Sequence, residues 1–181
     1  MPYLTAAVVF VGALSALNLV LALAMVKRLR EHSGLLTGRR GAPSADLEVG
    51  TRIAEFETVT EAGESLTRAS LTEDLLVAFF SPGCAPCVEK LPAFVAHTRS
   101  LPGGRRGVLA VVVGEPREAA AFAAPLGPFA QVVVEEPNGA LSRAFGVHSY
   151  PTLLRIGPDA EGRPVVTSNA VDLKRPTAMA A

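Results

Sequence analysis

The sequence predicts an α/β domain with a mixed central sheet and helices on both faces, preceded by one N-terminal transmembrane helix. Three features of the 181 residues carry this prediction: an uncharged apolar opening, short apolar runs that alternate with helical patterns, and a closing pair of strand patterns joined by a turn. Strands that alternate with helices favour parallel pairing, and a closing hairpin is expected to add antiparallel edge strands.

The opening segment, residues 3–26, carries no charged side chain. As a helix it would be about 36 Å long at roughly 1.5 Å per residue, which exceeds a hydrocarbon core of about 30 Å. A cleaved signal peptide is the alternative, since Ala22-Leu23-Ala24 has the form of a cleavage site. However, no basic residue precedes the run, which is longer than a signal core of about 7–15 residues. We therefore predict that residues 1–26 are a single-span membrane anchor.

Residues 27–48 are expected to form a basic flank and a linker. Residues 27–42 hold five basic side chains against one acidic side chain, a net charge of +4, whereas the whole chain has 17 of each and a net charge of zero. The positive-inside rule places this flank, and the domain after it, in the cytoplasm. A balanced total charge favours no nucleic-acid partner.

The globular domain is expected over residues 49–168, followed by a tail over residues 169–181. Residues 51–68 hold a strand pattern and the turn signal Glu-Ala-Gly-Glu-Ser, which together predict a hairpin. Continuous apolar runs predict strands buried on both faces, at 75–80, 107–113 and 130–135. Helical patterns cover 85–99, 117–126 and a short stretch from Asn138, and the closing strands are predicted at 151–156 and 164–168.

The predicted helix at residues 85–99 places apolar residues at helical spacing. Val88, Leu91 and Val95 are expected on its buried face, with Phe94 beside them. Pro92 interrupts the pattern and is expected to kink the helix.

The only two cysteines, Cys84 and Cys87, stand at the predicted junction between a strand and this helix. A disulfide here would close a very small loop and would constrain little of the unfolded chain, so a structural staple would contribute little stability. Cys84 is expected at the helix N-terminus, where unpaired N–H groups and the helix dipole stabilise a thiolate. Cys87 lies one turn further in, and Pro86 stiffens the turn between them. The arrangement predicts a nucleophile, Cys84, and a resolving thiol, Cys87.

A zinc site and a pair of inert buried thiols are the alternatives for these cysteines. A zinc site needs about four ligands, but there is no second cysteine pair, and His32, His97 and His148 are scattered along the chain. Dithiol–disulfide chemistry is preferred to both alternatives, and with it we expect no metal and no cofactor.

A second segment sharpens the prediction. Pro151 opens a predicted strand after a loop, which makes Tyr150–Pro151 a candidate cis bond. Together with Cys-Ala-Pro-Cys, this segment resembles the thioredoxin fold over about residues 45–168. The resemblance implies that the loop before Pro151 packs against the cysteine pair, and that Tyr150 offers backbone groups to an extended substrate. Thr152, after the proline, also matches the pattern.

Within that superfamily the chain is most similar to the membrane-anchored TlpA-like thiol–disulfide reductases. The anchor, the lead-in at residues 54–71 and the Leu-Pro-Ala-Phe after the pair carry this similarity. Accessory proteins of methylamine dehydrogenase maturation share the layout, including Phe-Phe-Ser-Pro before the first cysteine. Two positions depart from the pattern. Gly83 replaces the usual Trp, and Ala78 replaces thioredoxin's buried acid, so no carboxylate there takes a proton from Cys87.

The sequence therefore predicts a membrane-tethered thiol–disulfide oxidoreductase that reduces or exchanges protein disulfides and receives electrons from another thiol protein. His148 and Glu89 are candidate modulators, because an imidazolium near the pair would favour the thiolate and Glu89 could relay a proton. The alternatives, an exposed loop histidine and a solvated helix face, are favoured. Two other function classes stay open: an assembly module with little redox activity, and a thiol peroxidase in which Cys84 reacts with peroxide and Ser81 replaces the usual Thr.

The side of the membrane is a separate question. The charge rule favours a cytoplasmic domain, whereas the resemblance implies a domain outside the cytoplasmic membrane, where disulfides persist. We favour the extracytoplasmic placement, because a soluble thioredoxin already serves the cytosol and an anchor would add little there.

Overall fold

The computed structural model describes residue 12, residues 47–71 and residues 73–173. Apart from residue 12, the predicted transmembrane span lies outside the described residues, as do the basic flank and the end of the predicted tail. Within the described part of the chain, no helix combines the length and the apolar character that a membrane crossing requires.

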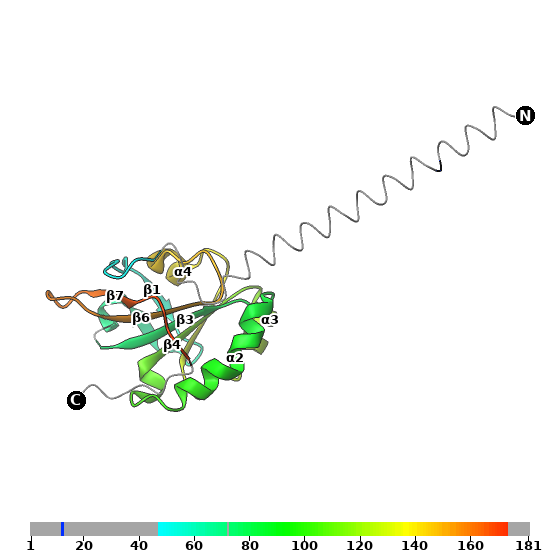
Figure 1. The fold of residues 1–181 in the computed structure, drawn as a ribbon, viewed down its shortest axis with the longest axis horizontal. Helices are drawn as coiled ribbons and strands as arrows, with labels where there is room; N and C mark the ends of the chain where they lie inside the picture. Colours follow the sequence, from blue (N-terminus) through cyan, green and yellow to red (C-terminus); the bar gives the residue numbers. More distant parts are fainter. Residues whose placement is uncertain (1–11, 13–46, 72, 174–181) are drawn as a thin grey trace, which may run out of the picture. The chain divides into compact units, whose positions relative to one another are not determined.

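The described chain forms a small hairpin and a five-stranded sheet (Figure 1). The hairpin consists of β1 (Glu57–Val59) and β2 (Ser65–Thr67). The sheet has the order β5-β4-β3-β6-β7, with β3 (Leu75–Phe80), β4 (Val108–Val113), β5 (Gln131–Glu135), β6 (Thr152–Pro158) and β7 (Pro164–Ser168). The helices are α2 (Ala85–Thr98), α3 (Pro116–Ala123) and α4 (Ala140–Phe145), with 3₁₀ turns η1 (Arg68–Ser70) and η2 (Gly104–Gly107).

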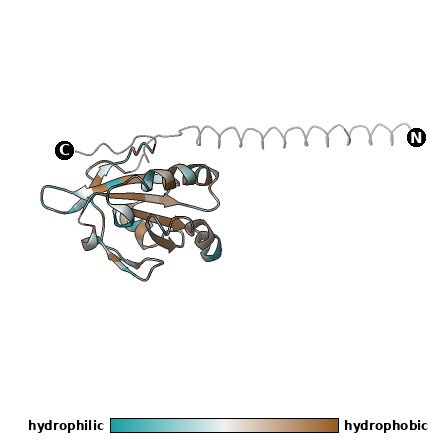
Figure 2. Cartoon of the chain, turned by 90° about the horizontal axis from the view of Figure 1, so that it is seen from below, coloured by the Kyte–Doolittle hydropathy of each residue, from teal (hydrophilic) through white to brown (hydrophobic). Residues whose placement is uncertain are grey.

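The sheet is mixed, as the sequence predicts. Strands β3, β4 and β5 are parallel, whereas β6 runs antiparallel to β3, and β7 antiparallel to β6. The expectation that the closing hairpin supplies only edge strands needs correction, because β6 lies between β3 and β7. Every residue of β3 and β4 is buried, which accounts for the continuous apolar runs of these strands. Figure 2 shows the strands of the sheet mostly in brown, the hydrophobic end of the scale.

Two hydrophobic cores cover the two faces of the sheet. One core joins the hairpin and α4 to the sheet and includes Phe56, Phe79 and Phe145. The other joins α2 and α3 to the opposite face and includes Phe80 and Phe94. Figure 1 shows α4 on one side of the sheet and α2 with α3 on the other. Helices therefore lie on both faces, which confirms the predicted fold class for the described domain.

Helix α2 buries the expected face except at Val88, since Leu91 and Val95 are partly buried against the core. It continues through Pro92, and Phe94 is fully buried, but Val88 is 52% exposed. The buried face begins with Cys87 rather than Val88, and returns about every 3.6 residues at Phe94 and Thr98. The prediction erred by one position because the cysteine itself packs into the core.

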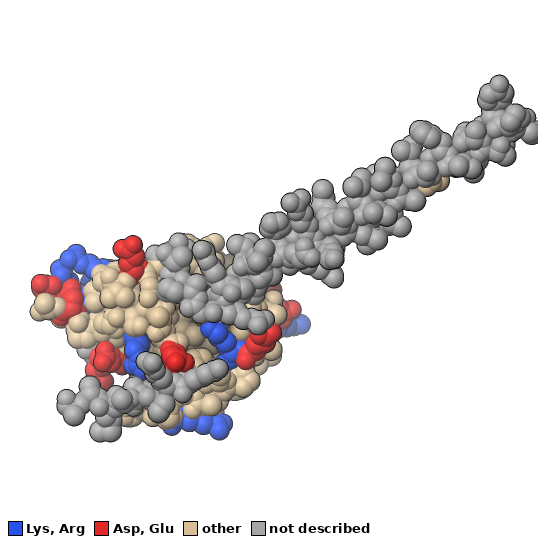
Figure 3. All heavy atoms as spheres, viewed as in Figure 1, with Lys and Arg blue, Asp and Glu red and all other residues tan. Residues whose placement is uncertain are grey.

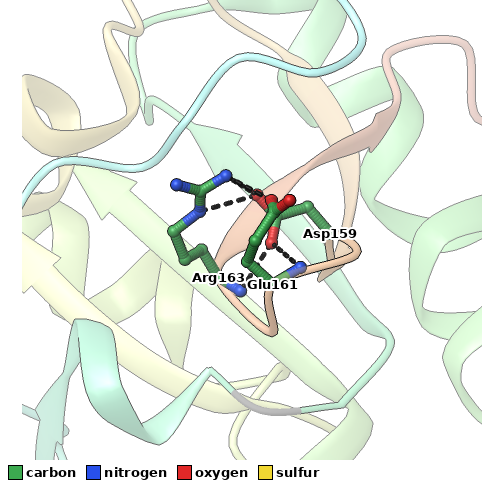
Figure 4. Close-up of polar contacts among 3 residues, drawn as sticks. All are labelled: Asp159, Glu161 and Arg163. Atoms are coloured by element: carbon green, nitrogen blue, oxygen red, sulfur yellow. Dashed lines mark hydrogen bonds and ion pairs between the residues drawn. The ribbon is translucent and has the colours of Figure 1, made fainter.

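The turn between β6 and β7 is fixed by its own polar groups (Figure 4). The Asp159 carboxylate accepts hydrogen bonds from the backbone N–H of Glu161 at 3.0 Å and of Arg163 at 2.8 Å, and from Arg163 Nε at 2.8 Å. These bonds from Arg163 lower the pKa of Asp159 to about 2. Gly162 supplies the positive φ of 77° that the turn requires. On the face of the molecule that Figure 3 shows, acidic and basic side chains are interspersed over the surface.

Candidate redox site

The site begins at the N-terminus of α2, which follows β3 through a short turn. Cys84 is the N-cap residue, with extended backbone angles φ −99° and ψ 107°. Its N–H donates to the carbonyl of Ser81 at 3.1 Å, and its carbonyl accepts from the N–H groups of Cys87 at 2.9 Å and Val88 at 3.2 Å. The backbone therefore fixes the start of the helix, and the half-buried thiol of Cys84 is left at its tip.

Cys87 lies one turn into the helix and is fully buried. Both cysteines are free thiols in this structure. Burial raises the pKa of Cys87 to about 12, and a side-chain hydrogen bond with Cys84 and the charge of Cys84 act in the same direction. The backbone of Ser81 and the charge of Lys90 oppose this rise. The two cysteines are thus unequal, because one is half-accessible and the other is held as a neutral thiol inside the core.

The loop before β6 completes the site. The Tyr150–Pro151 bond is cis, in agreement with the sequence prediction. The Cys84 thiol donates to the Tyr150 carbonyl with an Sγ–O distance of 3.4 Å, which joins residues 66 positions apart. Thr152 is buried, and its hydroxyl donates to the carbonyl of Ser149 at 2.7 Å. The half-buried Tyr150 packs against both cores. The fold therefore brings Cys84, Cys87 and the predicted proline loop together.

The candidate modulators differ in their positions relative to the cysteine pair. Pro86 occupies the first turn of α2, as expected. Glu89 and His148 are both exposed, and among the described residues no hydrogen bond or ion pair joins either of them to a cysteine. The sequence favours a solvated helix face and an exposed loop histidine at these two positions, and the exposure of both side chains agrees with that preference.

Sequence reasoning missed two contributors to the site. Gly114 directly follows β4, and a Cβ there would lie 3.1 Å from Cδ of Pro82, so glycine allows the turn before Cys84 to pack against the end of this strand. A glycine that directly follows a buried strand is the signal that would have found it. Lys90 is the second contributor, and its spacing of three residues from Cys87 is the corresponding signal.

Metal binding finds no support in the part of the chain that the structure describes. Within it, no group of three or more His, Cys, Asp or Glu residues gathers closely enough to hold a metal ion.

Comparison with known proteins agrees with this geometry. The model of the AhpC/TSA family matches residues 49–162. No curated protein sequence shows a significant match to the chain.

Solved structures are similar as well. The thioredoxin domain of a thiol-disulfide oxidoreductase from Bacteroides vulgatus aligns with a TM-score of 0.54 and 15% identity, covering 71% of this chain and 93% of that one. A thiol:disulfide interchange protein from Bacteroides sp. gives 0.51 and 16%, covering 67% and 80%. A thiol:disulfide interchange protein of the thioredoxin family from Chlorobium tepidum TLS gives 0.50 and 25%, covering 69% and 88%. The described domain therefore has a thioredoxin-like fold.

Proposed function

The chain belongs to the AhpC/TSA family, and we propose that it is a thiol–disulfide oxidoreductase that uses Cys84 and Cys87 to reduce or exchange protein disulfides. One observation carries the proposal. The half-buried Cys84 thiol contacts the Tyr150 carbonyl at 3.4 Å, while Cys87 is buried one helical turn away. This arrangement offers one accessible nucleophile, one protected second thiol and an adjacent backbone acceptor.

The proposed reaction has two steps. The Cys84 thiolate attacks one sulfur of a substrate disulfide, forms a mixed disulfide and releases the other substrate sulfur as a thiolate. Cys87 then loses its proton and attacks Cys84 Sγ, which forms the Cys84–Cys87 disulfide and releases the second substrate thiol. When the thiol of Cys84 no longer donates to Tyr150, that carbonyl is free to accept a backbone N–H from an extended substrate. An external thiol protein would return two electrons to the pair.

The direct test measures reduction of insulin disulfides by the full chain in detergent micelles. We expect activity in the native chain, no activity in Cys84→Ser, and an accumulated mixed disulfide in Cys87→Ser. A Cys84→Ser chain that still reduces insulin would contradict the assignment. Faster alkylation of Cys87 than of Cys84 at pH 7 would contradict the roles of the two thiols.

A second candidate function has its own supporting observation. Ala78 lies in the same core as Cys87, so this position of β3 offers no carboxylate to accept the proton in the second step. This favours an assembly or binding module in which a mixed disulfide persists and turnover is slow. The reductase is distinguished by repeated turnover of insulin, and the thiol peroxidase, a third candidate, by peroxide consumption. A chain inactive in both assays would support the assembly module.

We further propose that residues 1–26 anchor the domain and that the domain faces away from the cytoplasm. The uncharged 24-residue segment supports the anchor, whereas the basic flank at residues 27–42 opposes this orientation. Two fusions after Ala181 test the orientation, one to alkaline phosphatase and one to a fluorescent protein that matures only in the cytosol. An inactive phosphatase with a bright fluorescent fusion would reverse the proposed side.

A further inference from the structure

Cys87 lies in the apolar core between α2 and the sheet. To this core β3 contributes Leu76, Ala78 and Phe80, and β4 and β6 contribute Val108, Ala110, Val112 and Leu153. Helix α3 adds Ala119 and Ala123, and Tyr150 packs against the same core from the loop before β6. Two ionisable groups from α2 and its N-cap act on Cys87, and they are Cys84 and Lys90.

The relative contributions of Cys84 and Lys90 to the pKa of Cys87 change during the reaction. In the dithiol, burial, the hydrogen bond with Cys84 and the charge of Cys84 all raise the pKa of Cys87. In the mixed disulfide, the Cys84 sulfur has neither a proton nor a charge, so both of its contributions disappear. Burial then remains as the cause that raises the pKa of Cys87, and the backbone of Ser81 and the Lys90 charge remain as causes that lower it. Of the two charges named above, that of Lys90 is the one that still acts on the attacking thiol.

The position of Lys90 fits this role. It follows Cys87 by three residues in α2, so the two side chains share one face of the helix, with Cβ atoms about 5–6 Å apart in standard geometry. Lys90 is half-buried, and among the described residues no carboxylate forms an ion pair with it. The flexible ammonium of Lys90 can reach toward the buried sulfur along the helix surface.

We propose that Lys90 is a positioning residue for the resolving step, in which its ammonium stabilises the Cys87 thiolate as that thiolate attacks the mixed disulfide. This inference rests on the proposed oxidoreductase function. In the step, the Cys87 S–H proton passes to hydroxide or water, and the sulfur electron pair forms the bond to Cys84 Sγ. The bond between Cys84 and the substrate sulfur breaks, and its electron pair leaves with the substrate as a thiolate that solvent protonates.

The test uses the reduced full chain in detergent and the neutral disulfide 2,2′-dithiodipyridine, followed by stopped-flow absorbance. Cys84 attack releases one pyridinethione and Cys87 attack releases a second, so the two steps give separate phases. A neutral probe is chosen because it has no charge of its own for Lys90 to attract.

For Lys90→Gln we expect the second phase to slow about fivefold at pH 7, and its rise with pH to move to higher pH, because one screened charge is lost. The first phase should stay unchanged. Lys90→Arg, which keeps the charge, should restore the second phase to within about twofold of the native rate. Arg106→Gln is the matched control, because it removes an exposed positive charge from η2, before β4 and at the opposite end of the parallel strands, and it should alter neither phase.

Three outcomes would overturn the inference. The second phase of Lys90→Gln could remain within about twofold of the native rate, Lys90→Arg could fail to restore it, or both phases could slow equally, which would indicate a merely structural role. Absence of the first phase in the native chain would instead refute the oxidoreductase proposal itself, and the two failures are therefore distinguishable.

Discussion

The turn at Asp159–Arg163 and the turn at Ser81–Cys87 are both short, but the contacts of their side chains differ. In the first, one carboxylate accepts three hydrogen bonds from groups no more than four residues away. In the second, local backbone hydrogen bonds join Ser81, Cys84 and Cys87, and the Cys84 thiol also contacts the carbonyl of a residue 66 positions away at 3.4 Å. The side chains of the exposed turn are bonded within the turn, whereas the cysteine turn is also bonded to a distant loop.

The ionisable groups of the two turns follow the same division. Hydrogen bonds from Arg163 lower the pKa of Asp159 to about 2, so the charged form is favoured. Burial raises the pKa of Cys87 to about 12, so the neutral form is favoured. Arg163 therefore stabilises the charged carboxylate of Asp159, whereas burial keeps Cys87 as a neutral thiol inside the core.

The largest expected difference between the two turns comes from replacing one polar side chain in each of them. Cys84→Ser should reduce insulin reduction to the uncatalysed rate, because it removes the nucleophile. Asp159→Asn should leave the activity at the native level, because its turn lies outside the redox site. Turbidity of reduced insulin measures both variants. Equal losses in the two variants would show that the β6–β7 turn contributes to the reaction after all.

The next largest effect is an alkaline loss of stability that depends on Cys87. Its folded pKa of about 12 lies above its ordinary value of 9.0, so the stabilising effect is complete below pH 9 and is lost as the pH rises toward 12. The free energy of unfolding should fall by at most about 1.4 kcal/mol per pH unit across this window.

Urea unfolding of the native chain and of Cys87→Ala measures this effect, because other groups that titrate at high pH are common to both chains. The slope against pH should be shallower in Cys87→Ala. Asp159→Asn is the control and should keep the native slope. Parallel slopes in the native chain and Cys87→Ala would mean that burial of this thiol is not linked to stability.

A smaller effect is expected from the backbone of the exposed turn. Gly162→Ala forces a side chain into a positive φ of 77° and should cost about 1 kcal/mol of unfolding free energy. Gly107→Ala is the matched control, because its φ is not positive and its added Cβ would meet no atom within 4 Å. Urea unfolding at neutral pH compares them. Insulin reduction should be unchanged in both, and equal stability of the two variants would remove the claim of backbone strain.

The smallest effect is an acid titration of the exposed turn. The folded pKa of Asp159, about 2, lies below its ordinary value of 3.8, so its stabilising effect is present above pH 3.8 and is lost as the pH falls toward 2. Arg163→Gln should raise the pKa of Asp159 toward its ordinary value. Carboxyl chemical shifts measured against pH report this directly, and an unchanged midpoint in the variant would exclude Arg163 as the cause.

The sequence predicted the parts of the fold that repeat a simple pattern. The runs at 75–80 and 107–113 match β3 and β4 closely, because strands buried on both faces are continuously apolar. The hairpin was expected over residues 51–68, but β1 starts only at Glu57, because Arg52 pairs instead with Val165 of β7. Such a pairing between distant segments leaves no local pattern in the sequence.

The site was predictable to the same extent. The spacing of Cys84 and Cys87 and the proline at 151 indicated which segments meet, and the structure brings these segments together. The prediction for α2 was wrong at Val88. Valine is strongly apolar and was therefore assigned to the core, whereas in the structure the neighbouring Cys87 is buried and Val88 is exposed. The contact between Gly114 and Pro82 joins two separate loops, so no single window of sequence contains it.

Tyr150 gives the site an optical property. The chain has no Trp and two Tyr, at positions 3 and 150. Tyr150 packs against both cores, one of which holds Cys87, and its carbonyl contacts the Cys84 thiol, so this tyrosine belongs to the site whose sulfur atoms change during the reaction. In a Tyr3→Phe chain, tyrosine emission would come from this one ring. The oxidation state of the pair and the arrival of a substrate could then be followed in ultraviolet light, without a label and without a tryptophan background.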